Sequence, residues 1–263
     1  MFTLTSSIGW FPGTLPEKFA AIKAHGFKAV EILGWSGLDL EAASKAIEES
    51  GIEISAILIQ SKDPEKQKYL SNTHGMVWED SVPVFADCLK ETIEAAKYMH
   101  TKTIVVTSGN ERSDIPREAQ HKNIVNLLKT IAPIAEAAGV QLVLEPLNIL
   151  VNHMGYYLTT TAETAEIITE VGSPNVKILY DVYHQQITEG NLINNIRKYI
   201  DLIGHIHVGD VPGRKEPGTG EINYKNVFKA IRDTGYSGYV VFECGISEDV
   251  ELVCPKMWKL LED

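Results

Sequence analysis

The segments IAEAAGVQLVLEP at 134–146 and IITEVGSPNVKILYD at 167–181 show the pattern that decides the fold of this chain. Each begins with apolar residues three and four positions apart, continues through a Gly, and ends in a short run rich in β-branched residues. The first part predicts an amphipathic helix that ends at a left-handed Gly, and the last part predicts a buried strand. A helix, a turn and a strand therefore form one repeating unit.

The same unit recurs along the chain, at 20–33, 45–58, 94–108, 199–210 and 230–243. The Gly at 26, 51, 139, 172, 204 or 235 is the expected helix cap of its unit. With the N-terminal run 2–8, this gives eight strands separated by seven helices, and a last helix is expected at about 248–262. Strands that alternate with helices form parallel sheets, and eight of them favour a closed (β/α)8 barrel, an α/β fold, over an open doubly wound sheet.

Length and composition agree with one such barrel. A chain of 263 residues is long for an average domain but normal for an α/β barrel, and no linker or change in composition divides it. Hydrophobic residues make up 44% and charged residues 22%, which is enough for a large core and excludes a disordered chain. We therefore expect a single domain over residues 1–263.

Charge and cysteine usage limit the expected partners and location. The formal net charge of −11 repels phosphate backbones and anionic membranes, so no nucleic-acid or membrane partner is expected. No apolar run approaches the about 18 residues of a membrane span, and no basic residue precedes Lys18. The three cysteines show no metal-ligand spacing and fit a reducing compartment. These observations predict a cytoplasmic protein and leave a homo-oligomer open.

Polar residues end four consecutive predicted strands. Glu145, Asp181 and Glu243 end the runs VQLVLE, VKILYD and YVVFE, and His207 lies in the run HIHV. In a parallel barrel these ends meet at one rim, where the following loops build active sites. Carboxylates beside an apolar core are costly unless they are paired or bind a metal. Each acid alone could cap a loop or pair with Lys or Arg, but together the four residues predict one divalent cation, with Mn²⁺ or Mg²⁺ favoured over Co²⁺ or Zn²⁺.

Several other polar residues are candidates for substrate contacts. His184 follows Asp181 by three residues and is a further ligand, a partner of a ligand or, as we favour, a hydrogen-bond donor to substrate. Arg214 lies in a Pro- and Gly-rich loop and either clamps a substrate oxygen or pairs with Glu216 or Asp210. Weaker candidates lie near the ends of three other strands, at Glu31, Gln60 and Asn110. His205 shares the strand face of His207 one layer deeper, where a satisfied core histidine is expected.

Two glutamates beside a divalent cation suit proton transfer next to a carbonyl, because the cation stabilises the enediolate that forms. Glu145 and Glu243 are the expected acid–base pair. Proton return to the same carbon on its opposite face gives epimerisation, and return to the neighbouring carbon gives isomerisation. The sequence does not choose between these two outcomes.

The chain has further distinctive segments around the same residues, namely Glu145-Pro146-Leu147-Asn148, Asp181-x-x-His184, HIHVGDVPGRKEPGTGEINY at 205–224, Gly235-Tyr236-x-Gly238 and Phe242-Glu243. Through them nearly the whole chain resembles the xylose isomerase-like barrel superfamily of sugar isomerases and epimerases, and most closely its hydroxypyruvate isomerase group. The resemblance implies metal ligands at Glu145, Asp181, His207 and Glu243, an acid–base pair at Glu145 and Glu243, and substrate contacts by His184 and Arg214. It also implies a small sugar or keto-acid substrate that reacts through a cis-enediolate, in the manner of hydroxypyruvate and tartronate semialdehyde.

Four alternatives remain at this point. Hydroxypyruvate isomerases carry Gln where this chain has His207, whereas the related ketose 3-epimerases of the tagatose and psicose type carry His. A lyase similar to inosose dehydratase would start from the same proton abstraction. An apurinic endonuclease needs more His ligands than the strands ending near Gln60 and Ser108 supply. The last alternative is a binding protein without catalysis.

Overall fold

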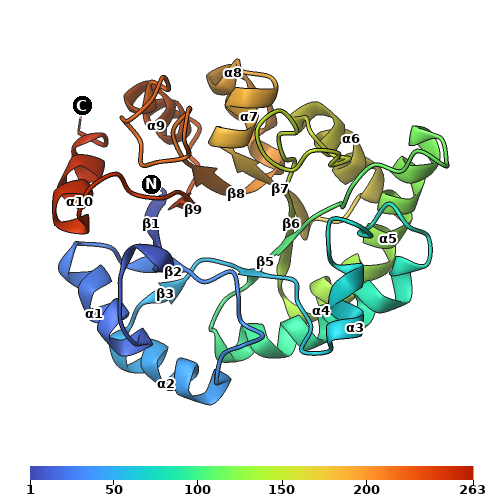
Figure 1. Cartoon of the computed structure of the whole chain (residues 1–263), viewed down its shortest axis with the longest axis horizontal. Coiled ribbons are helices and arrows are strands. Elements are labelled where there is room, and N and C mark those ends of the chain that lie inside the picture. The colour runs from blue at the N-terminus through green and yellow to red at the C-terminus, as the bar shows by residue number, and fades with distance from the viewer. Residues whose placement is uncertain (263) are drawn as a thin grey trace.

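A parallel sheet of nine short strands forms the wall of a barrel in the computed structural model, which describes residues 1–262 (Figure 1). The strands are β1 (Thr3–Ser7), β2 (Ala29–Glu31), β3 (Glu53–Ile54), β4 (Ile57–Leu58), β5 (Thr103–Val106), β6 (Gln141–Leu144), β7 (Val176–Asp181), β8 (Ile203–Val208) and β9 (Tyr239–Phe242). Their order around the sheet is β3-β2-β1-β9-β8-β7-β6-β5-β4. The expected α/β barrel is thereby confirmed.

The two ends of this sheet meet in one segment of the chain. β3 pairs with β2 and β4 pairs with β5, and only Ser55 and Ala56 separate β3 from β4. The backbone N–H of Leu58 donates to Leu33 at 2.9 Å, and that of Ile59 donates to Val105 at 2.9 Å. The single strand expected within 45–58 is therefore divided in two, because one half bonds to each edge of the sheet and so closes the wall.

Helices surround the strands, as expected for apolar faces that pack on a parallel sheet (Figure 1). They are α1 (Leu15–Ala24), α2 (Leu40–Ser50), α3 (Pro64–Tyr69), α4 (Ser81–Tyr98), α5 (Arg117–Ala138), α6 (Thr161–Val171), α7 (Val182–Thr188), α8 (Leu192–Tyr199), α9 (Tyr224–Asp233) and α10 (Val250–Lys259), with 3₁₀ turns at Ile8–Trp10 and Ile200–Leu202. Two helices, α7 and α8, occupy the connection where one was expected. Within residues 1–262, no helix combines the length and apolar character needed to cross a membrane.

Glycines end the helices as expected at most of the predicted positions, for example at Gly51 and Gly139, where φ is +67°. The prediction is wrong at Gly204, which lies inside β8. The register between β7 and β8 passes from Ile203 directly to His205, so Gly204 is the extra residue of a bulge. A Cβ at Gly204 would lie 2.8 Å from the Cβ of Lys177 on β7, so the close approach of these two strands requires glycine.

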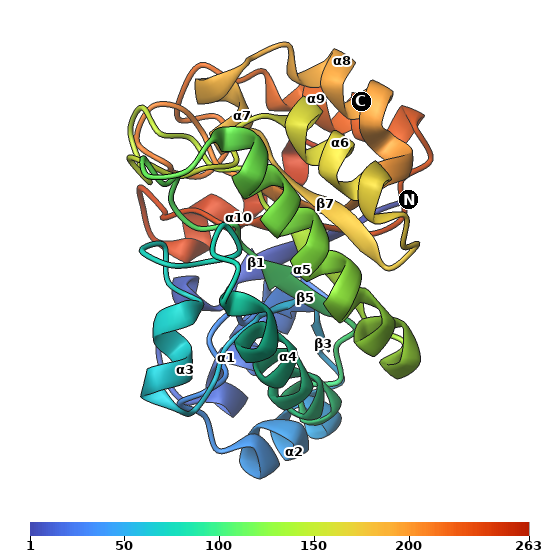
Figure 2. The same ribbon diagram turned by 90° about the vertical axis from the view of Figure 1, so that its right-hand side faces the viewer.

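Apolar side chains fill one layer of the barrel interior on the side of β5, β6 and β7. Ala56, Val105, Val143 and Leu179 form a small cluster apart from the main core, and each is at most 1% exposed. Because alternate residues of a strand point to the same face, Glu145 and Asp181 lie on the inner face one layer above Val143 and Leu179. The long loops after β4, β6 and β8 gather on one side of the molecule (Figure 2), which is where these strands end. The fold thus places the strand-end acids at the mouth under the loops.

Candidate functional site

Four side chains from neighbouring strands meet at the mouth of the barrel. Asp181 ends β7, His207 lies in β8, and Glu145 and Glu243 directly follow β6 and β9. Each offers a nitrogen or oxygen atom within 4.8 Å of those of the others. We call Glu145, Asp181, His207 and Glu243 the rim cluster. The structure therefore brings together all four residues that the sequence singled out for a metal.

The ring of His207 is oriented so that its two nitrogens face different groups. Its Nδ1 lies 3.3 Å from Glu243 Oε2 and 3.7 Å from Glu145 Oε1. This Nδ1 is buried and forms no hydrogen bond among residues 1–262, whereas Nε2 contacts Glu31. A buried imidazole nitrogen that faces carboxylates without a hydrogen bond fits the position of a metal ligand. The donor set of the rim cluster thus suits a divalent cation.

The charges of the rim cluster are unbalanced. Burial, together with the neighbouring Glu243 and Asp181, raises the pKa of Glu145 to about 7. Burial also disfavours ionisation of Asp181, but His184 and Arg214 outweigh it and hold the pKa of Asp181 below its ordinary value. Three neighbouring carboxylates face one imidazole here, and such an arrangement favours either proton uptake or a bound cation.

Arg214 supplies positive charge to this cluster. Its Nη2 lies 3.2 Å from Asp181 Oδ2 and forms an ion pair with Glu243. The side chains of Arg214 and Glu243 are each 27% exposed, so the cluster opens to solvent on their side. The expected salt bridge of Arg214 to Glu216 or Asp210 is wrong, because both of those carboxylates bond elsewhere.

The loop that carries Arg214 is fixed by buried acids. Asp210 accepts hydrogen bonds from the backbone N–H groups of Gly218 at 2.7 Å and Ile222 at 3.1 Å. Glu216 is 2% exposed and accepts from the backbone N–H of Ser247 at 2.8 Å. A charged acceptor with several backbone donors holds a loop in one conformation. Asp210 and Glu216 therefore shape the loop rather than neutralise Arg214.

His184 lies fully buried beside the rim cluster. Its Nδ1 accepts the backbone N–H of Asn148 at 3.1 Å, and burial lowers the pKa of the ring to about 4. The neutral ring therefore carries its proton on Nε2. This Nε2 lies 3.5 Å from Asp181 Oδ2 and has no hydrogen-bond partner among the described residues. His184 thus presents a donor at the edge of the cluster.

Two of the three weaker candidates, Gln60 and Asn110, have other contacts. The side-chain oxygen of Gln60 accepts the backbone N–H groups of Trp35 at 2.9 Å and Ser36 at 3.1 Å. Asn110 donates its backbone N–H to Asn72 at 2.7 Å, and its side-chain oxygen is buried without a partner. Neither side chain bonds to the rim cluster in the described part of the chain.

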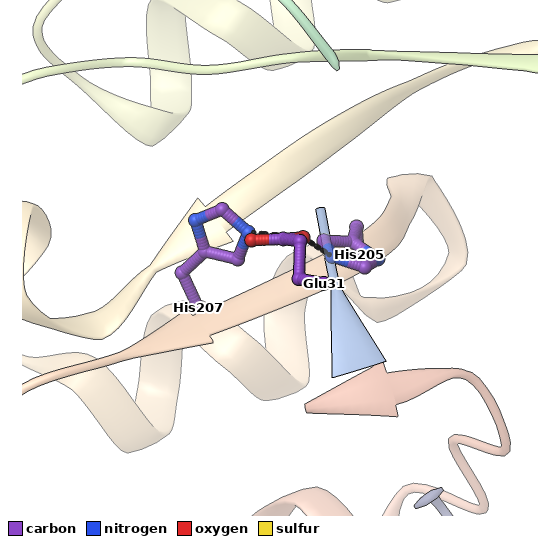
Figure 3. Close-up of side chains that lie close together, drawn as sticks. All are labelled: Glu31, His205 and His207. Carbon is purple, nitrogen blue, oxygen red and sulfur yellow. Dashed lines mark hydrogen bonds and ion pairs between the residues drawn. The ribbon is translucent and has the colours of Figure 1, made fainter. Parts of the chain in front are cut away.

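Sequence reasoning missed the role of Glu31. Its carboxylate lies between the rings of His205 and His207, both of which come from β8 (Figure 3). The same oxygen, Oε1, is 2.9 Å from His205 Nε2 and 3.1 Å from His207 Nε2. We call Glu31, His205 and His207 the deep cluster. Glu31 stands in the apolar run AVEIL, and a lone acid in such a run is a signal for a buried carboxylate.

The geometry can be compared with known proteins at this point. The sequence profile described as "Xylose isomerase-like TIM barrel" matches residues 19–254. The chain belongs to this family. It is 31% identical over 249 residues to a putative hydroxypyruvate isomerase of Homo sapiens, covering 90% of this chain and 87% of the relative. It is also 36% identical over 156 residues to the hydroxypyruvate isomerase of Escherichia coli, covering 59% of this chain and 60% of that enzyme.

Solved structures of this xylose isomerase-like barrel family extend the likeness. A D-psicose 3-epimerase superposes with a TM-score of 0.74 at 21% identity, covering 91% of this chain and 84% of the epimerase. At this identity the likeness concerns the fold alone. The named relatives are isomerases and epimerases, so the expected enzyme class is confirmed.

Proposed function

We propose that this chain is a divalent-metal-dependent isomerase of a small hydroxy-carbonyl or sugar substrate, of the hydroxypyruvate isomerase type. One observation carries the proposal: Glu145 and Glu243 flank an unpartnered, buried Nδ1 of His207 at the mouth of the barrel. Glu145, Asp181, His207 and Glu243 would hold the ion, with Mn²⁺ or Mg²⁺ favoured over Co²⁺ or Zn²⁺ because three of the four donors are carboxylates.

A bound cation would supply positive charge that stabilises an enediolate formed from the substrate. The proton itself would be moved by the two glutamates. A general base works best when its pKa is near the operating pH, and the pKa of Glu145 is raised to about 7. We assign proton removal from the substrate carbon to a carboxylate oxygen of Glu145 and proton return to Glu243.

The neighbouring donors would orient the substrate. His184 Nε2–H would donate to a substrate oxygen, since it has no partner of its own among the described residues. Arg214 would bind a carboxylate or carbonyl of the substrate through its planar guanidinium. We place Gln60 and Asn110 as further contacts of the substrate, from the loops after β4 and β5.

A ketose 3-epimerase is the second candidate. Its supporting observation is that two carboxylates, rather than one, lie within reach of the same point. Two acid–base groups from separate strands can remove and return a proton on opposite faces of one carbon. The isomerase reaction proposed first moves the proton to a neighbouring carbon instead.

The experiment that tests the proposal follows solvent deuterium into substrates. The purified protein is stripped with a chelator and incubated in D₂O with hydroxypyruvate or with a panel of ketoses, with and without Mn²⁺. Exchange into hydroxypyruvate and its product supports the isomerase, and label at C3 of recovered ketose supports the epimerase. An enone that absorbs in the ultraviolet would instead indicate a lyase.

The same assay carries its own control. Glu79→Gln alters an exposed carboxylate in the loop between β4 and β5 and is expected to leave exchange unchanged. Exchange that persists undiminished in the chelated protein would overturn the metal dependence. A lack of exchange into every substrate, at full metal occupancy, would overturn the isomerase and the epimerase together.

A further inference from the structure

The deep cluster lies below the rim cluster and shares His207 with it. Glu31 is 3% exposed, His205 0% and His207 1%, so water does not compete for their polar atoms. The two rings stand edge to face, with centroids 5.1 Å apart. The proposed reaction uses neither Glu31 nor His205. Burial of a carboxylate and an imidazole costs folding free energy unless the groups are paired or hydrogen-bonded.

The hydrogen bonds of the deep cluster fix the position of one proton on each ring. Both Nε2 atoms lie within hydrogen-bond distance of Oε1 of Glu31 (Figure 3). An ionised carboxylate only accepts, so each ring must carry a proton on Nε2 to form these bonds. When a neutral imidazole carries its proton on Nε2, the lone pair of the ring is on Nδ1.

In the neutral form of His207, which is the form that binds a metal, that lone pair has a defined direction. Its Nδ1 faces Glu243 at 3.3 Å and Glu145 at 3.7 Å, toward the rim cluster. In the opposite tautomer, a proton on Nδ1 would fill the ligand position and leave Nε2 without a proton for Glu31. The contact with Glu31 therefore decides which nitrogen His207 presents to the mouth of the barrel.

We propose that Glu31 is a positioning residue that holds His207 with the Nδ1 lone pair aimed into the rim cluster, ready to bind the metal. His205 is the second donor to the same carboxylate oxygen, and it restrains the rotation of Glu31. This inference rests on the proposed function, because it assigns Glu31 a role toward the cation of that site. Partners that hold a metal-binding His typically change metal affinity by about 10- to 100-fold when they are removed.

A second metal ion in the deep cluster is the competing interpretation, since its three residues also place ligand atoms close together. Hydrogen bonding explains the cluster better, because the single carboxylate serves both rings through one oxygen atom. The described residues supply no second carboxylate to the deep cluster. The number of ions bound per chain separates the two interpretations.

Titration of the metal-free, full-length protein with Co²⁺ tests the proposal through the visible spectrum of the bound ion. Wild-type protein should bind one equivalent. Glu31→Leu should weaken binding by about 10- to 100-fold and change the cobalt spectrum, because a leucine side chain cannot accept the Nε2 proton of His207 and the ligand nitrogen is no longer fixed. His205→Asn keeps the bond between Glu31 and His207 and should weaken binding much less. The matched control, Glu53→Leu, changes an exposed carboxylate on β3 and should leave both affinity and spectrum unchanged.

Two outcomes of this titration would overturn the proposal. One is a Glu31→Leu variant with the wild-type affinity and cobalt spectrum. The other is a wild-type protein that binds two equivalents, of which Glu31→Leu loses one. A loss of affinity in which the spectrum stays as in the wild type would also count against it, because a merely structural defect leaves the ligand geometry of the bound fraction intact.

A second measurement needs no variant. Long-range ¹H–¹⁵N NMR spectra of ¹⁵N-histidine-labelled wild-type protein should show slowly exchanging Nε2–H protons on both His205 and His207. A His207 ring without a proton on Nε2 would overturn the proposal even if Glu31→Leu fails to fold. If wild-type protein binds no cobalt, the proposed function fails, whereas these spectra still decide whether Glu31 positions His207.

Discussion

The rim cluster and the deep cluster share His207 but have opposite charge balances. The rim cluster has three carboxylates and one imidazole, whereas the deep cluster has one carboxylate and two imidazoles. In the deep cluster each close contact joins a donor to an acceptor, although the Nδ1 atoms of His205 and His207 have no hydrogen-bond partner among residues 1–262. In the rim cluster the acids repel one another, and Arg214, His184 and His207 oppose them. We infer from this contrast that the deep cluster stabilises the fold, whereas the rim cluster is the proposed site of cation binding and chemistry.

The largest expected effect concerns the two glutamates of the rim. Glu145→Gln or Glu243→Gln keeps the shape of the side chain but removes the acid–base group, so the rate of deuterium exchange should fall by about 10²- to 10⁴-fold. Exchange measured by NMR at saturating Mn²⁺ checks this, with Glu79→Gln as the control. Unchanged turnover in both variants would indicate that the glutamates take no part in the reaction.

The deep cluster should instead show its largest effect in stability. Glu31→Leu leaves two buried imidazole N–H groups without an acceptor and should lower the free energy of unfolding by about 3 kcal/mol. Urea denaturation of the metal-free protein measures this. Glu53→Leu, which removes an exposed carboxylate from the neighbouring strand β3, should change the same free energy by less than about 1 kcal/mol. Equal losses of unfolding free energy in Glu31→Leu and Glu53→Leu would contradict the stabilising role of the deep cluster.

In metal-free protein, removal of a carboxylate from the rim cluster should raise the free energy of unfolding, whereas removal of Glu31 should lower it. The pKa of Glu145 is about 7 in the folded chain, against an ordinary value of 4.5. A raised carboxyl pKa means that the folded state binds the extra proton, so stability falls as pH rises from about 4.5 to about 7. Glu145→Gln should therefore stabilise the protein at pH 8 by about 2 kcal/mol and have little effect at pH 4.

Denaturation curves in the presence of EDTA across this pH range check the prediction for Glu145. A destabilising effect of Glu145→Gln at pH 8 would show that this carboxylate is a stabilising element, like Glu31. The contrast between the two layers would then no longer hold.

The smallest expected effect concerns the loop above the rim. Arg214→Lys keeps the positive charge but loses the planar guanidinium that contacts Asp181 and Glu243 together, and it should lower kcat/KM by about 10-fold. Steady-state assays on hydroxypyruvate and on a neutral ketose measure the change for each substrate. A larger loss on hydroxypyruvate would show that Arg214 binds the substrate carboxylate, and an equal loss would limit it to the acids of the rim.

Much of the fold could be predicted because the repeat is local. Helix faces, Gly caps such as Gly51 and Gly139, and buried strand runs are each defined within about 15 residues, and their number indicates the barrel. The division of the segment 53–58 and the bulge at Gly204 could not be predicted. Both depend on how strands from separate units pair with each other, as the register shift between β7 and β8 at Gly204 shows.

The sequence by itself determined which residues reach the mouth of the barrel, because parallel strands all end at one rim and the polar residue at each end is visible in the chain. Only the tertiary structure decided how those residues are held. Glu31 and His207 are 176 positions apart and come from β2 and β8, between which β1 and β9 lie in the sheet. Closure of the barrel turns their inner faces toward each other, and no local pattern contains that information. Arg214 follows β8 and therefore contacts Asp181 at the end of β7 and Glu243 after β9, the two strands that pair with β8, instead of its neighbours in sequence.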